Sequence, residues 1–157
     1  MTSQQFDRWV EHYEQCDIAI HDNIKRAKRD CCYSSDQQRA VKTAVHFYDG
    51  EIVKTALLRE VNIRSITTTR LKLHRSVWLV VGRIGWLLNH PTQEEKKMTL
   101  LRAKEIIDEI ESTPYSNVLV TSHGAFMTVL RRELRRRGYK GKYFFKPNNG
   151  ELYLFEK

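Results

Sequence analysis

The 157-residue chain is poor in the residues that mark unusual protein classes. It contains only 7 glycines and 3 prolines, while hydrophobic residues make up 41% of it. So few glycines and prolines exclude a fibrous repeat or a low-complexity chain, and the hydrophobic share favours a packed core. Since a chain of this length suits one core, we expect residues 1–157 to form a single domain.

Cysteine is also scarce, and the 3 cysteines do not suggest a disulfide framework. Cys31 and Cys32 are adjacent, so their Cβ atoms point apart, and Cys16 stands alone. The simplest interpretation is a reducing compartment, in which buried thiols serve as small hydrophobic side chains. The sequence has no ligand spacing typical of a metal site, so we predict neither a metal nor a cofactor.

No hydrophobic run is long enough to cross a membrane. The longest, residues 77–88, is interrupted by Arg83, whereas a spanning helix needs about 20 residues. We interpret this run as a buried helix. Because the first residues also lack the charged and then hydrophobic pattern of a secretory leader, we expect a cytoplasmic protein with no membrane partner.

Acidic residues are in the minority, with 19 against 27 lysines and arginines, a net charge of +8. A basic excess favours anionic partners such as phosphorylated small molecules or nucleic acid, although a solvated basic surface explains it equally well. Much of the excess lies between Arg131 and Lys142. A helix ending there would bury a hydrophobic face, and its arginines would suit the negative end of the helix dipole. Nucleic-acid binding is therefore disfavoured, though it stays an alternative.

The hydrophobic periodicity predicts alternating helices and strands. Helices are expected at residues 2–17, 21–30, 37–48, 75–88, 92–112 and 125–137, and strands at residues 31–33, 51–58 and 118–121. A terminal hairpin is expected from residues 143–146 and 151–155 around a turn at 147–150. This alternation predicts an α/β domain of three layers, with a mostly parallel sheet between two layers of helices.

Two of the expected strands end in polar residues just before a helix. Ser34-Ser35-Asp36 follows the first strand, and Ser122-His123-Gly124 follows the strand at 118–121. Ligands of parallel sheets bind at the carboxyl ends of the strands, so both segments are candidates for a site. Arg39 lies in the first turn of the next helix, where its planar guanidinium could bond two oxygens of a phosphoryl group.

Two further residues could take part in chemistry at the same edge. His123, at a strand end beside Gly124, could donate to an anion that the exposed backbone amides also bind. Glu60 follows the strand at 51–58, and a carboxyl group placed beside bound phosphate could protonate a leaving oxygen. Taken singly, a surface arginine, a capping histidine and a surface glutamate are the more frequent explanations.

The order of these motifs resembles the histidine phosphatase superfamily, which includes phosphoglycerate mutases and many small phosphatases. The chain carries Ser-Ser-Asp-x-x-Arg-Ala-x-x-Thr-Ala at residues 34–44, Leu-x-x-Glu at 57–60 and Ser-His-Gly at 122–124. The resemblance extends over nearly the whole chain. It implies a phosphoglycerate mutase-like fold and phosphomonoester hydrolysis, with a phosphorylated small molecule or a phosphoprotein as substrate.

The resemblance also implies a role for each candidate residue. Arg39 would clamp the phosphoryl group, and Glu60 would act as the acid or base. His123 would be the second histidine of the pocket, which stabilises the transferring group. Gly124 and Ala125 would offer their backbone amides to the phosphate.

The sequence departs from the family in one respect. The family's first strand ends in Arg-His-Gly and supplies the nucleophilic histidine, but this sequence has no such motif, and His123 alone among its histidines precedes glycine. Because no phosphohistidine can form without the nucleophile, we expect this chain to be inactive or nearly so. A phospho-ligand binding module without turnover is the alternative function.

Two explanations of this departure stay open. Either the start was assigned to an internal methionine of a longer, N-terminally truncated protein, or the chain is a shortened and inactive relative. The intact remaining pocket favours the first. A missing first strand would leave a vacancy in the sheet, so low stability or self-association is also expected.

Overall fold

The computed structural model describes residues 1–13 and 28–157, so Cys16 and most of the helix expected at residues 21–30 lie outside the described part. The contacts divide the chain into two compact units. The first consists of Met1–Cys16 and Val61–Thr99, and the second of Asp17–Glu60 and Leu100–Lys157. That residues 1–157 form a single domain stays a prediction.

A parallel sheet lies at the centre of the second unit. It contains β1 (Cys31–Ser35), β2 (Ile52–Thr55) and β3 (Val118–Thr121) in the order β2-β1-β3, and both neighbours pair with β1 in parallel. Every residue of β1 is buried, as expected of a central strand covered on both faces. The predicted parallel sheet is confirmed.

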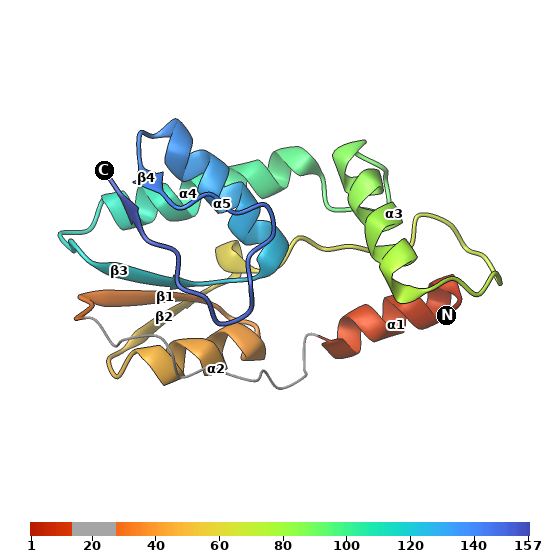
Figure 1. Ribbon diagram of the computed structural model, residues 1–157, viewed down its shortest axis with the longest axis horizontal. Coiled ribbons are helices and arrows are strands. Elements are labelled where there is room, and N and C mark those ends of the chain that lie inside the picture. The colour runs from red at the N-terminus through yellow and green to blue at the C-terminus, as the bar shows by residue number, and fades with distance from the viewer. Residues whose placement is uncertain (14–27) are drawn as a thin grey trace. The chain divides into compact units, whose positions relative to one another are not determined.

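Helices cover both faces of this sheet. α2 (Gln38–Phe47) lies on one face, while α4 (Lys96–Glu111) and α5 (Gly124–Arg136) lie on the other (Figure 1). Ala44 of α2 packs with Cys32 and Leu119 of the strands in one buried cluster. The predicted α/β class, with a sheet between two layers of helices, is therefore confirmed.

The strand expected at residues 51–58 is shorter than predicted. β2 ends at Thr55, and Ala56–Leu58 forms a 3₁₀ turn, η1. The Thr55 hydroxyl accepts a hydrogen bond from the backbone amide of Leu57 at 3.2 Å, which stabilises this early turn. The turn ends two residues before Glu60.

The terminal hairpin differs from its prediction. β4 (Lys140–Gly141) pairs antiparallel with β5 (Phe155–Glu156), while residues 142–154 form no strand. Side chains hold this intervening segment together, because the carboxylate of Glu151 accepts from Lys142 at 2.6 Å, Asn148 at 2.7 Å and Tyr153 at 2.8 Å. The alternating hydrophobic pattern did not reveal this local polar cluster.

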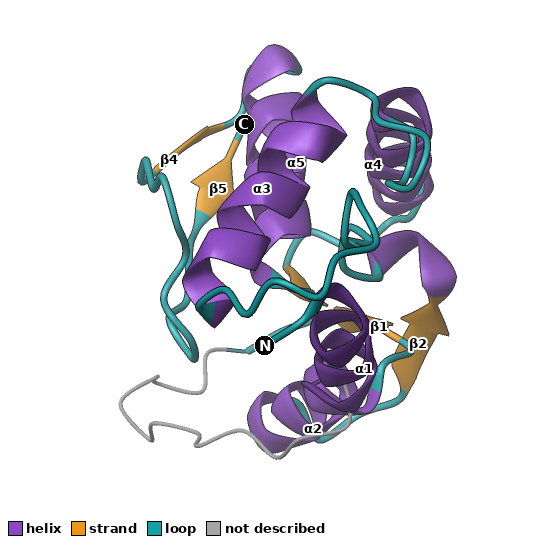
Figure 2. Cartoon of the chain, turned by 90° about the vertical axis from the view of Figure 1, so that its right-hand side faces the viewer, coloured by secondary structure: helices purple, strands orange, loops and turns teal. Residues whose placement is uncertain are grey.

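The first unit is built around aromatic side chains. Phe6 of α1 (Ser3–Tyr13) and Trp78 of α3 (Arg75–Leu87) form a buried cluster with Ile63. The two rings stack with their centroids 5.7 Å apart. Ile63 belongs to residues 60–74, which contain neither helix nor strand and form part of the loops drawn in Figure 2.

The helix expected to be buried at residues 75–88 has only one buried face. Gly82 and Trp86 are buried, whereas Val80 is 57% and Ile84 is 50% exposed. Gly82 allows close packing, because a Cβ atom there would lie 2.2 Å from Cγ2 of Ile63. No helix in the described part of the chain has the length and hydrophobicity needed to cross a bilayer.

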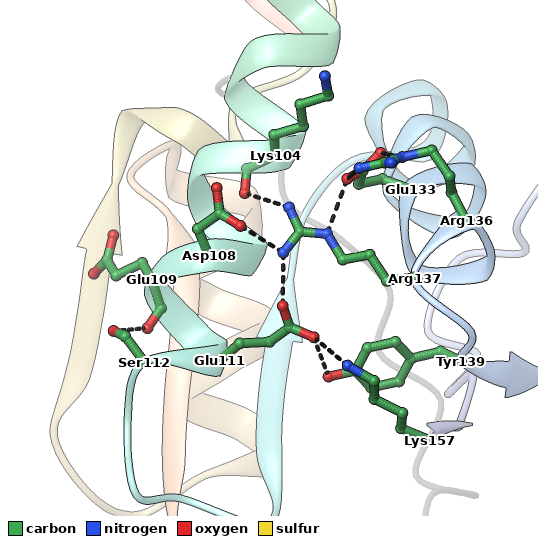
Figure 3. Close-up of polar contacts among 10 residues, drawn as sticks. All are labelled: Lys104, Asp108, Glu109, Glu111, Ser112, Glu133, Arg136, Arg137, Tyr139 and Lys157. Atoms are coloured by element: carbon green, nitrogen blue, oxygen red, sulfur yellow. Dashed lines mark hydrogen bonds and ion pairs between the residues drawn. The ribbon is translucent and has the colours of Figure 1, made fainter.

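Acidic partners engage part of the basic stretch at the end of α5. The guanidinium of Arg137 lies among Lys104, Asp108 and Glu111 of α4 and Glu133 of α5 (Figure 3). It donates to Glu133 at 2.9 Å, to Glu111 at 2.7 Å and to the carbonyl oxygen of Lys104 at 3.2 Å. Such a network ties α4 to α5, so these charges have a structural role.

Candidate functional site

The candidate site lies in the second unit, where β1 and β3 end next to each other. Ser34 of β1 pairs in register with Thr121 of β3, so Ser35 and the residues that follow Thr121 emerge at the same edge of the sheet. This is the carboxyl edge, at which ligands of parallel sheets bind. The Ser-Ser-Asp and Ser-His-Gly motifs therefore meet here, as their places after the strands suggested.

His123 is half-buried and occupies the N-cap position of α5. Its Nε2 atom lies 3.0 Å from Oγ of Ser35, which joins the ends of the two strands. Burial lowers the pKa of His123 below its ordinary value, and the positive charge of Arg39 lowers it further. The carboxylates of Glu60 and Asp36 oppose this shift. Glu60, Arg39 and Asp36 therefore all lie close enough for their charges to act on the imidazole.

The side chain of Glu60 reaches the N-terminus of α5. Its carboxylate accepts hydrogen bonds from the backbone amides of Ala125 at 3.2 Å and Phe126 at 3.0 Å. Its own backbone amide donates to Oε1 of Gln37 at 3.2 Å. A carboxylate in this place is favourable because the first amides of a helix lack intrahelical partners and carry partial positive charge.

This arrangement bears on the two residues expected to offer amides to phosphate. The amide of Ala125 donates to Glu60, so a ligand would have to replace that carboxylate to reach it. Gly124 is exposed at the first position of α5. Phosphate binding by either amide stays a prediction.

Arg39 lies in the first turn of α2, whose N-cap residue Gln37 makes no side-chain cap hydrogen bond. Instead, the amide of Gln37 donates to Oγ of Ser35 at 3.3 Å. Ser35 thus contacts both the start of α2 and His123 at the start of α5. Three separate segments therefore bring Arg39, Glu60 and His123 to one edge of the sheet.

Sequence reasoning missed an ion pair beside this group. Arg59 donates from Nε and Nη2 to the two carboxylate oxygens of Asp36, at 2.7 and 2.5 Å. Hydrogen bonding to Arg59 holds the pKa of Asp36 below its ordinary value. Although Asp36 belongs to the Ser-Ser-Asp motif, no local pattern could have paired it with a residue 23 positions later.

The described residues show no cluster of side chains suited to a metal ion. No group of three or more histidines, cysteines, aspartates or glutamates in residues 1–13 and 28–157 is placed to hold one. The nearby side chains instead combine a guanidinium, an imidazole and carboxylates at a sheet edge. Together, the fold and this edge define an α/β protein whose candidate site lies at the carboxyl edge of a parallel sheet.

Comparison with known proteins identifies the family. Residues 14–156 match the sequence profile of the histidine phosphatase superfamily (branch 1). The chain therefore belongs to the histidine phosphatase superfamily, which confirms the resemblance found in its motifs.

One curated relative is similar over much of the chain. The chain is 31% identical over 124 residues to the Hydrogenobacter thermophilus protein named "Putative phosphoserine phosphatase 2". The match covers 71% of this chain and 58% of that protein, so it spans little more than half the length of the relative. No solved structure matches the chain.

Proposed function

We propose that the carboxyl edge of the sheet binds the phosphoryl group of a phosphomonoester, and that the chain is part of a phosphomonoester hydrolase. The convergence of Arg39, Glu60 and His123 from three separate segments is the observation that carries this proposal. Membership of the superfamily supports it independently.

Each residue has a distinct proposed role. The guanidinium of Arg39 bonds two phosphoryl oxygens, because its planar fork matches their spacing. His123 stabilises the charge of the transferring group, and Glu60 exchanges a proton with the leaving oxygen as acid or base. The exposed amide of Gly124, at the positive end of α5, adds a further donor to the anion.

The substrate class follows from the phosphoryl site alone. A phosphorylated small molecule or a phosphoprotein supplies the required group, and phosphoserine is the first ester to test because of the name of the curated relative. Nucleic-acid binding is less favoured, since acidic residues already engage arginines of the basic stretch.

A second candidate function is phospho-ligand binding without turnover. One sequence observation favours it: the chain contains no Arg-His-Gly motif, so it has no counterpart of the family's nucleophilic histidine. Covalent catalysis divides a difficult displacement into two easier steps, and losing it lowers the rate by several orders of magnitude.

We expect the 157-residue chain to bind orthovanadate and phosphate but to release no phosphate from phosphoserine or p-nitrophenyl phosphate above background. Oxyanion binding is measured by calorimetry and phosphate release by a colorimetric assay. Hydrolysis that is abolished by His123→Ala would contradict turnover-free binding. Failure to bind either oxyanion at millimolar concentration would contradict the proposed site itself.

A further inference from the structure

Arg102, on α4, binds the short segment that leads to Glu60. Its Nη1 atom lies 3.4 Å from the carbonyl oxygen of Ala56, 3.1 Å from that of Leu57 and 3.0 Å from that of Arg59. These carbonyl groups belong to η1 and to the residue that caps it. The last of them is part of the peptide group that joins Arg59 to Glu60, so Arg102 acts directly on the backbone that carries this glutamate.

The same guanidinium also contacts the helix that receives the Glu60 carboxylate. Its central carbon lies 4.5 Å from the centroid of the Phe126 ring, a distance typical of cation–π stacking. Phe126 is fully buried, and its backbone amide donates to Glu60 at 3.0 Å. Arg102 therefore touches both the segment from which Glu60 extends and the residue that fixes its carboxylate.

The peptide group before Glu60 is fixed from both sides. Arg102 binds its carbonyl oxygen, while Oε1 of Gln37 accepts from its amide at 3.2 Å. One residue earlier, the hydroxyl of Ser122 donates to the carbonyl oxygen of Leu58 at 2.8 Å. Three side chains, from α4, from the N-cap of α2 and from the residue after β3, thus hold a segment that has no strand pairing of its own.

We propose that Arg102 is a positioning residue, which holds the Glu60 carboxylate at the start of α5 and beside His123. Its importance for chemistry rests on the proposed function, in which Glu60 acts on a bound phosphate ester. The positioning itself can be measured without turnover, because the charge of Glu60 acts on the imidazole of His123. Neither the motifs nor the spacing of the sequence single out this arginine.

The test is a double-mutant cycle read by NMR titration of the His123 ring. Glu60→Gln removes the carboxylate's charge, and in the otherwise unchanged protein it should lower the pKa of His123, because the carboxylate favours the charged imidazole. In the Arg102→Met background we expect Glu60→Gln to lower it by less than about a third of that amount, because the carboxylate has already moved away. Asp36 and Arg39, the other charged groups near the imidazole, are unchanged throughout the cycle.

An equal effect of Glu60→Gln in both backgrounds would overturn the proposal. A purely structural role for Arg102 would lower the melting temperature and leave this coupling intact. Lys104→Met, which removes a cation from an exposed position of the same helix, is the matched control and should preserve the coupling. If Arg102→Met does not fold, Arg102→Lys takes its place.

Lysine keeps the charge but lacks the planar fork, so Arg102→Lys should weaken the coupling to about half. Full coupling in that variant would likewise overturn the proposal. The experiment separates the two hypotheses. If Arg102→Met weakens the coupling while the protein binds neither oxyanion, only the proposed function is refuted. Whether the two variants bind oxyanions does not bear on the positioning, because the change in the pKa of His123 measures the positioning directly.

Discussion

Arg39→Met is expected to weaken orthovanadate binding by about tenfold or more, since a hydrogen bond to a charged group contributes about 1.5–3 kcal/mol. Arg39 lies in the first turn of α2, and its charge acts on His123 across the carboxyl edge of the sheet. Arg39→Lys should retain part of the affinity, because lysine keeps the charge but cannot bond two oxygens in one plane. Isothermal titration calorimetry measures all three proteins at one ionic strength.

Arg132→Met provides the matched control for this experiment. Arg132 is exposed on α5, away from the first turn of that helix, and its loss changes the net charge by the same amount. We expect it to leave the affinity for vanadate within about twofold, since exposed charges are largely screened at distances beyond about 10 Å. An equal loss of affinity in Arg132→Met and Arg39→Met would indicate attraction to the overall positive charge instead of a specific clamp.

Acidification should destabilise the second unit as pH falls from about 4.5 to about 2, because Glu133 titrates in that interval. Hydrogen bonds from Arg136 and Arg137 lower the pKa of Glu133 from 4.5 to about 2. A group whose pKa is depressed by folding stabilises the folded state above its unfolded pKa, and this contribution disappears as pH falls to the folded pKa. Since Arg136 is 63% exposed and therefore screened, we expect a loss of about 2 kcal/mol, less than the full shift implies.

Glu133→Gln tests this assignment. The Glu133 side chain is only 7% exposed, so the variant should be less stable than the unchanged protein at pH 7, and the difference should shrink as pH approaches 2. Urea unfolding at several pH values measures both free energies of unfolding. Glu105→Gln, at an exposed position of α4, is the control and should show a constant, small difference. A pH-independent difference for Glu133→Gln would contradict the role assigned to the network in Figure 3.

Much of the second unit's fold could be predicted from the sequence, because its signals are local. The hydrophobic run Val118–Thr121 has the bounds of β3, and helix α5 begins one residue from its predicted start. Short hydrophobic runs followed by polar residues and a helix are typical of parallel strands, so the edge that carries His123 and Arg39 was also predictable. The polar residues at the strand ends were thus the ones that predicted the position of the candidate site.

The remaining features depend on tertiary contacts that no local pattern records. The pair between Asp36 and Arg59 joins residues far apart in sequence, and so does the contact of Glu60 with the start of α5. The contacts of Arg102 could not be predicted, because its three carbonyl partners are backbone groups, which have no sequence signature. The short β4–β5 pairing was misplaced because a two-residue ladder leaves no hydrophobic alternation.

The most direct test of a phosphoryl site at the carboxyl edge is a two-dimensional amide NMR titration of the 157-residue protein with inorganic phosphate. We predict that the largest chemical-shift changes occur at Arg39, His123 and Gly124, and that they saturate together with one dissociation constant. Changes confined to the basic stretch between Arg131 and Lys142, without saturation at the sheet edge, would contradict the account.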